Sequence, residues 1–225
     1  MYSKYLDMLA KHGVSGAHPG GLQLTKEILN TLPINSSTKL IDLGCGTGQT
    51  LVYLARTYPC KAIGVDINDQ MLFKAGQRLK SENLYIELVC ADVMNLPFPP
   101  NSFDIALSES VTLFTSIDKA LNEYARVLKP GGTLIAIEMT SEPSLDEREL
   151  KEIKSVYGIM KVPCLNEWKS MFRQAGFKDI NVYDVRINSP LRLKSIQMMY
   201  DFSPHFSIIR RYGRKLKYKV YRCRI

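Results

Sequence analysis

The stretch Lys39-Leu40-Ile41-Asp42-Leu43-Gly44-Cys45-Gly46-Thr47-Gly48 places an apolar strand, a carboxylate and three alternating glycines in one uninterrupted line. Glycines at the end of a strand let the backbone turn sharply and approach a ligand without clashes from a Cβ atom. The apolar segment 50–55 that follows predicts a helix. We therefore expect the loop to present free N–H groups to a ligand at the N-terminus of that helix.

Two acids distinguish this loop from one that binds a dinucleotide. Asp42 precedes the glycines at the tip of the strand, where its charge would repel a pyrophosphate and attract an ammonium group. A second apolar strand, 62–65, ends in Asp66, which follows Asp42 by 24 residues. That spacing is in the range expected for a carboxylate that binds ribose hydroxyls. One acid for an amine and one for a ribose indicate an amino-acid nucleoside.

Further motifs follow in a fixed order: Gly64-Val-Asp66, Ala91-Asp92-Val93, Leu96-Pro97-Phe98, Phe103-Asp104-Ile105-Ala106 and Arg126-Val-Leu-Lys-Pro-Gly-Gly132. With these motifs the sequence resembles the class I S-adenosylmethionine-dependent methyltransferases. It is similar to the small-molecule type that includes the quinone-biosynthesis and sterol methyltransferases. The resemblance spans roughly residues 37–140, so it covers the cofactor half well and the substrate half poorly. It implies S-adenosylmethionine as the cofactor.

Alternating strand and helix patterns predict an α/β fold with a mostly parallel sheet and helices on both faces. The resemblance implies a Rossmann-like sheet of seven strands, in which the last strand is antiparallel. We expect helices at 1–16, 22–32, 48–57, 68–80, 116–128, 142–154 and 166–176, the last one capped by Asn166, and strands at 38–43, 61–65, 85–90, 103–107, 132–138, 179–187 and 215–220.

Three regions are expected along the chain. Residues 1–36 would form N-terminal helices and a flap, and residues 37–188 the cofactor-binding core. Residues 189–225 would form a basic C-terminal extension that completes the sheet. The chain has 225 residues and 45% hydrophobic content, which suits one core.

Composition indicates the compartment of the protein and whether it binds a metal. The five cysteines are odd in number, scattered, and free of any Cys-x-x-Cys pair, so we expect reduced thiols and no metal site. The N-terminus lacks an apolar signal segment, and no stretch approaches a membrane-spanning run. These features predict a cytoplasmic protein.

The formal charge of +8 is unevenly distributed. Residues 186–225 hold 11 Lys and Arg against one acid, Asp201, whereas residues 1–185 carry a net charge of −2. The asymmetry indicates either a solvated extension or contact with an anionic partner, for example an anionic membrane reached through residues 189–225. Nucleic acid is disfavoured as a substrate, because Ser108-Glu109-Ser110-Val111 replaces the Asn/Asp-Pro-Pro-Tyr/Phe tetrad that grips a flipped base.

The resemblance assigns roles at the rim of the sheet. Asp66 would bind the ribose hydroxyls, Ile67 and Met71 would pack near the adenine, and Asp92 would accept from its exocyclic amine. Asp42 would orient the loop or bind the ammonium group. The whole expected cofactor site comprises Asp42, Gly44, Cys45, Gly46, Gly48, Asp66, Ile67, Met71, Asp92, Val93 and Ser108.

Two residues are candidates for catalysis. Glu109 lies just past the fourth strand, where it would act as a base or hold a cationic amine. His18 lies in a His-Pro-Gly-Gly segment that resembles a flap able to close over the cofactor and exclude water. The expected reaction is in-line transfer of a methyl group to a small molecule. The alternatives are a membrane-associated lipid or quinone methyltransferase and a non-catalytic cofactor-binding protein.

Overall fold

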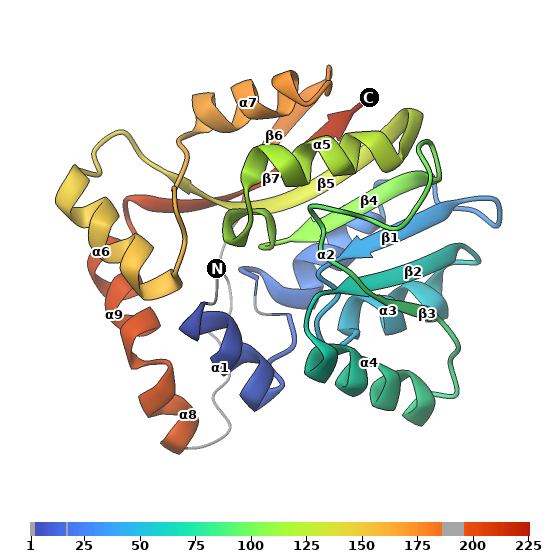
Figure 1. Cartoon of the computed structure of the whole chain (residues 1–225), viewed down its shortest axis with the longest axis horizontal. Coiled ribbons are helices and arrows are strands. Elements are labelled where there is room, and N and C mark those ends of the chain that lie inside the picture. Colours follow the sequence, from blue (N-terminus) through green and yellow to red (C-terminus); the bar gives the residue numbers. More distant parts are fainter. Residues whose placement is uncertain (1–2, 17, 186–195) are drawn as a thin grey trace.

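The computed structural model describes residues 3–16, 18–185 and 196–225. Its centre is one seven-stranded sheet in the order β3-β2-β1-β4-β5-β7-β6 (Figure 1). The strands are β1 (Lys39–Leu43), β2 (Lys61–Asp66), β3 (Glu87–Cys90), β4 (Phe103–Glu109), β5 (Leu128–Ser141), β6 (Ile180–Asp184) and β7 (Leu216–Arg224).

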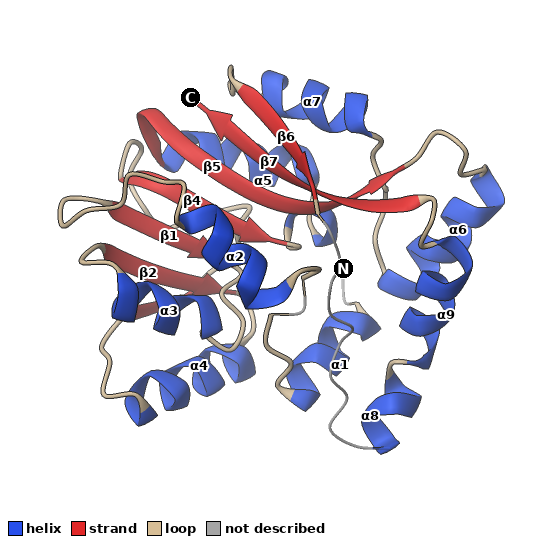
Figure 2. Cartoon of the chain, turned by 180° about the vertical axis from the view of Figure 1, so that it is seen from behind, coloured by secondary structure: helices blue, strands red, loops and turns tan. Residues whose placement is uncertain are grey.

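Helices cover both faces of the sheet. They are α1 (Lys4–His12), α2 (Gly21–Leu29), α3 (Gln49–Thr57), α4 (Asp69–Ser81), α5 (Ile117–Val127), α6 (Glu147–Tyr157), α7 (Leu165–Gln174), α8 (Ile196–Asp201) and α9 (Ser203–Tyr212), with a short 3-10 turn η1 (Thr112–Phe114). The helices α5 and α7 lie over one face, and α2 and α3 lie over the other (Figures 1 and 2). Strands enclosed in this way are largely apolar, as the buried Leu40, Ile41 and Leu43 of β1 show.

The strand directions confirm the predicted fold class. β1 pairs in parallel with β2 and β4, β2 with β3, and β4 with β5. β7 is antiparallel to both β5 and β6, between which it lies. Because parallel strands run in the same direction, the carboxyl ends of β1, β2 and β4 meet at one rim of the sheet.

Several boundaries differ from the sequence-based expectation. The first helix ends at His12, because Gly13 adopts the left-handed conformation and closes it. The helix expected at 142–154 begins only at Glu147, after Asp146 forms a capping box with Glu149. β5 runs to Ser141, beyond the expected end at 138, and residues 142–146 connect it to this helix. β6 ends at Asp184, and residues 186–187 of the strand expected at 179–187 lie outside the described residues.

The predicted cap of α7 was wrong. Cys164 is the N-cap residue, and its backbone N–H donates to Glu167 Oε2 at 2.8 Å. Asn166 therefore lies inside the first turn, one residue after the helix begins.

The basic C-terminal segment is built into the fold. Its last strand lies inside the sheet, and several of its cations pair with acids of earlier elements. Lys215 Nζ lies 2.7 Å from Glu149 Oε1, and Arg211 Nη1 lies 2.5 Å from Glu152 Oε1. Among the described residues, no helix has both the length and the apolar character needed to span a membrane.

Candidate cofactor site and its surroundings

The glycine-rich loop is a tight turn fastened to the neighbouring strand. The backbone N–H groups of Gly44 and Cys45 both donate to the carbonyl of Val65, at 2.7 and 2.8 Å. The N–H of Gly48 donates to the carbonyl of Cys45 at 2.9 Å. The prediction that these donors are free for a ligand was therefore wrong for Gly44, Cys45 and Gly48, because they hold the turn together.

Two glycines of the loop differ in what surrounds them. Gly44 and Gly46 both have positive φ, at 71° and 53°. A Cβ atom on Gly44 would lie 2.4 Å from Cγ2 of Val111, so the turn needs glycine there for space as well as for conformation. A Cβ atom on Gly46 would meet nothing within 4 Å. Gly46 therefore borders open space that a ligand can approach.

Asp66 connects this loop to the next strand and helix. Its Oδ2 accepts from the N–H of Gly46 at 2.9 Å, and its Oδ1 accepts from the N–H of Asn68 at 2.9 Å. Burial raises the pKa of the Asp66 carboxyl, while the hydrogen bonds from the backbone oppose that shift. Asn68 in turn caps α4 by accepting from Gln70 and Met71.

Three carboxylates gather at the rim where β1, β2 and β4 end. Asp42 is 2% exposed, and its Oδ2 has no hydrogen-bond partner. Burial raises the pKa of Asp42 well above its usual value, and the charges of Glu109 and Asp66 raise it further. Since removal of charge from water is costly without a partner, this rim favours a positively charged group.

Glu109 is the point at which the N-terminal flap meets the core. Its Oε1 accepts from Thr25 Oγ1 of α2 at 2.6 Å, and its Oε2 accepts from Thr50 Oγ1 of α3 at 2.9 Å. The buried His18 lies in the same cluster, with Nε2 at 3.6 Å from Glu109 Oε2 and 3.3 Å from Thr25 Oγ1. The structure thus brings the two candidate catalytic residues together.

Thr25 and Thr50 were not predicted as site residues from the sequence. Both are buried, although each carries a hydroxyl. Thr25 lies four residues before Leu29 on the buried stripe of α2, so the available signal was a polar residue on an apolar helical face.

A second set of contacts fastens the N-terminal segment over the glycine loop. Ser15 Oγ lies 2.8 Å from Thr47 Oγ1, and Arg78 Nη2 donates to the same Ser15 oxygen at 2.7 Å. The Lys74 ammonium donates to the carbonyl of Ala10 at the end of α1. The segment between α1 and α2 is therefore held against the loop and α4.

Some of the remaining residues predicted to bind the cofactor lie at the rim of the sheet, and others lie in the core. Asp92 lies in the turn after β3, where its Oδ1 accepts from the N–H of Met94 at 2.8 Å. Met71 and Val93 are buried beside this rim, whereas the Ile67 side chain is 66% exposed and projects into solvent.

Cys45 and Ser108, both predicted to bind the cofactor, have side chains that belong to the core. Ser108 is 0% exposed and lies 3.1 Å from the hydroxyl of Thr112. Cys45 Sγ packs against Gly64, and burial raises the pKa of its thiol. Any contact of these two residues with a ligand would therefore come from their backbone atoms.

Glu138 is a buried acid that the sequence analysis missed. It is 0% exposed on β5, and its Oε1 accepts from the N–H of Thr112 at 3.0 Å. Its carboxylate also interacts with the N–H groups of Val111 and Leu113, while its Oε2 has no partner. Burial raises the pKa of Glu138 to about 7. This acid holds the turn that presses Val111 against Gly44, and its signal was a single charge within an apolar strand.

The rim fits an adenosyl amino acid. It offers an unpartnered buried carboxylate oxygen on Asp42, further acids on neighbouring strands, and open space beside Gly46. An ammonium group suits the acids, and ribose hydroxyls suit a carboxylate at the end of β2.

Comparisons with known proteins agree with this fit. The methyltransferase domain family matches residues 41–136. The uncharacterized methyltransferase YodH of Bacillus subtilis is 40% identical over 177 residues, covering 78% of this chain and 75% of its own length. The demethylmenaquinone methyltransferase of Staphylococcus epidermidis is 32% identical over 185 residues, covering 70% and 75%.

A solved structure shows the same fold. A phosphoethanolamine N-methyltransferase 2 from Haemonchus contortus superimposes with a TM-score of 0.81 at 21% identity, over 98% of this chain and 56% of that one. The chain belongs to the class I S-adenosylmethionine-dependent methyltransferases. It is accordingly a methyl-transferring enzyme, and S-adenosylmethionine is its cofactor.

Substitution of the two loop glycines by alanine should separate packing from ligand access. Both Gly44→Ala and Gly46→Ala carry the cost of a positive φ, so that cost cancels in the comparison. Because only the first meets Val111, Gly44→Ala should lower the free energy of unfolding by about 2 kcal/mol more than Gly46→Ala.

The Gly46→Ala variant should instead bind S-adenosylhomocysteine about tenfold more weakly, because its new methyl group enters the open space. Urea unfolding and calorimetry measure the two effects. Equal stability of the two variants would contradict the role given to Val111.

Replacement of Glu138 by glutamine should remove a pH dependence of stability. The pKa of this acid is higher in the folded state than in the unfolded chain, so its contribution to stability is greatest at low pH and falls as pH rises toward 7. The loss amounts to on the order of 3 kcal/mol. Glu138→Gln should therefore be more stable than the wild type at pH about 8, by a margin that shrinks at pH about 5.

Glu123→Gln is the matched control for this measurement. The Arg126 guanidinium holds the pKa of Glu123 below its usual range, so this variant should lose stability relative to the wild type at high pH. Urea unfolding at both pH values tests the pair. A Glu138→Gln margin that does not change with pH would show that the acid is not buried in its charged form.

Proposed function

We propose that this enzyme transfers the methyl group of S-adenosylmethionine to a small-molecule acceptor by in-line displacement. The observation that carries this proposal is the cluster of Asp42, Asp66 and Glu109 at one rim, in which Asp66 accepts from the N–H of Gly46, a residue that borders open space. The bound cofactor would supply a methyl group already activated by a sulfonium centre. The residues of the chain then need only to bind and align the cofactor and the acceptor and to keep water away from them.

Asp42 and Glu109 would hold the ammonium group of the cofactor. Asp42 has an oxygen without a partner, and both oxygens of Glu109 already accept from threonine hydroxyls, which fixes the direction of its carboxylate. A carboxylate positioned in this way suits a fixed positive charge. We therefore favour this role for Glu109 over that of a general base.

Asp66 and Asp92 would bind the nucleoside. Asp66 lies at the end of β2 and would accept from the ribose hydroxyls, in addition to the two N–H groups that orient it. Asp92 would accept from the adenine amine after β3, with its position fixed by the N–H of Met94. Met71 and Val93 would supply apolar surface beside the adenine.

The flap would exclude water from the acceptor. His18 and Thr25 reach Glu109 from the N-terminal side, and Ser15 binds Thr47 of the glycine loop. Such closure keeps water from competing for the methyl group. In this proposal His18 is a residue of the closing flap.

Support for a small acceptor comes from the elements that surround the rim. Tyr5 of α1 stacks on Phe114 at 6.1 Å between ring centroids, and it meets Tyr157 of α6 edge-on at 5.0 Å. Because Tyr5 and Tyr157 are buried in this cluster, the three elements pack into a closed cover, which suits a small molecule better than a polymer lying across the surface.

Two variants should distinguish the residues that bind the amino-acid end of the cofactor from those that bind its nucleoside end. Glu109→Gln should weaken binding of S-adenosylhomocysteine about tenfold or more, because it loses a charge-assisted contact with the ammonium group. It should spare 5′-methylthioadenosine, which lacks the amino-acid portion. Asp66→Ala should weaken both ligands, because both contain the ribose.

Calorimetry with the two ligands measures these affinities. Equal weakening of both ligands by Glu109→Gln would contradict the ammonium assignment. Unchanged affinity for S-adenosylhomocysteine together with lost turnover would make Glu109 the base instead. Unchanged binding by Asp66→Ala would overturn the ribose assignment.

The nature of the acceptor is tested by incubation of the enzyme with methyl-labelled S-adenosylmethionine and a cell extract separated by size. We expect label in the small-molecule fraction, and the Asp66→Ala variant serves as the blank. Label confined to the protein or nucleic-acid fraction would contradict the proposal.

A further inference from the structure

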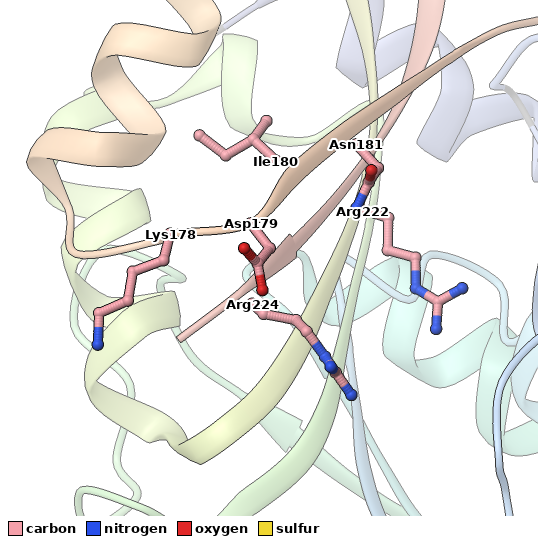
Figure 3. A pocket seen from close by; sticks show the side chains of 6 residues that line it. All are labelled: Lys178, Asp179, Ile180, Asn181, Arg222 and Arg224. Carbon is pink, nitrogen blue, oxygen red and sulfur yellow. The ribbon is translucent and has the colours of Figure 1, made fainter.

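A basic depression lies at the free edge of the sheet, far along the chain from the motifs of the cofactor site. Lys178, Arg222 and Arg224 line a hollow of about 440 Å³ together with Asp179, Ile180 and Asn181 (Figure 3). These residues belong to the start of β6, the end of β7 and the turn before β6.

Strand register places two of the cations on one face. Arg222 lies opposite Asn181 of β6, and residues opposite one another in an antiparallel pair share a face. Arg224 lies two residues further along β7 on that same face. Among the described residues, no helix crosses β6 and β7 on the side seen in Figure 2. Lys178 and Arg224 are exposed, and Arg222 is half-buried.

The charge of this depression is not compensated within the protein. In the part of the chain that the structure describes, none of Lys178, Arg222 and Arg224 forms an ion pair, and Asp179 is the only acid that lines the hollow. Lys219 of the same strand differs in this respect, since it pairs with Asp184. The excess charge of the C-terminal segment is thus partly neutralised by internal pairs and partly concentrated here.

We propose that this depression docks the protein on the phosphate headgroups of an anionic lipid bilayer. Arg fits phosphate through two parallel N–H donors, and a cluster of cations is attracted to the negative potential of such a surface. Tyr183 lies two residues after Asn181 on the same face and is 54% exposed, and tyrosine is favoured at the boundary between membrane and water.

A nucleic acid suits this surface less well. Its phosphates continue along a track, and binding strength depends on the number of phosphates that are neutralised. Residues 1–185 carry a net charge of −2, so the compact patch is not prolonged by a surplus of positive charge elsewhere in that region. A short, dense cluster is better matched to a planar array of headgroups.

Docking through this edge would leave the catalytic rim free. Arg224 lies opposite Thr133, near the start of β5, and the N–H of Ile225 donates to the carbonyl of Gly132. This is the end of the sheet where the parallel strands begin, whereas Asp66 and Glu109 lie where such strands finish. Docking at this edge would hold the whole protein at a membrane surface, whichever acceptor the enzyme methylates.

The test is co-sedimentation of the full chain with vesicles of phosphatidylcholine alone or mixed with phosphatidylglycerol, at about 50 and about 500 mM salt. The wild type should bind only the anionic vesicles, and more weakly at high salt because surface attraction is screened. Arg222→Glu/Arg224→Glu should bind at least about tenfold more weakly, since two attractive charges become repulsive.

Lys80→Glu/Lys151→Glu is the matched control, because it makes the same change of charge at two exposed positions on α4 and α6. It should keep most of the vesicle binding, and both double variants should keep wild-type affinity for S-adenosylhomocysteine as proof of folding. No binding of the wild type to anionic vesicles would overturn the proposal. An equal loss of vesicle binding in both double variants would also overturn it. So would binding of an RNA oligonucleotide by a wild-type chain that does not bind the vesicles.

Discussion

The structure depends on keeping several carboxylates close together in a buried place. Parallel strands place Asp42, Asp66 and Glu109 at one rim, where burial and the charges of Glu109 and Asp66 raise the pKa of Asp42. Partial compensation comes from backbone N–H groups at Asp66 and from two threonine hydroxyls at Glu109. Asp42 retains an oxygen without a partner. A bound cationic group would lower the free energy of this rim, because opposite charge is most effective where water is excluded.

The same constraint explains why separate parts of the chain converge on the rim. α2 contributes Thr25, α3 contributes Thr50, and the flap contributes His18, all at Glu109. The two threonines donate hydrogen bonds to Glu109 that the sheet alone does not provide, and His18 lies against Thr25 and the same carboxylate. The flap is therefore packed into this rim rather than appended to it.

A second buried acid, Glu138, connects β5 to the glycine loop. Glu138 on β5 holds the turn after β4, and that turn carries Val111 against Gly44. Since protein interiors are close-packed, a shift of this turn would be transmitted to the glycine loop. Through this turn, β5 is connected to the glycine loop.

The C-terminal strand serves both stability and surface chemistry. β7 lies between β5 and β6, so its buried side chains, including Tyr221 and Cys223, belong to the main core. Removal of the segment would delete an internal strand, and its charges are therefore best studied by point substitution. Alternation along the strand turns Arg222 and Arg224 outward while these apolar residues face inward.

The sequence by itself determined the alternation of strands and helices, the glycine turn after β1, and the acids at the ends of β1, β2 and β3. These features were predictable because they depend on local periodicity and on residues that lie close together in the chain. Tertiary structure alone decided that Thr25, Thr50 and His18 meet Glu109, and that Glu138 supports the turn beside Gly44. Those contacts join residues 26 to 91 positions apart, and only the packing of the sheet and its helices brings such distant groups together.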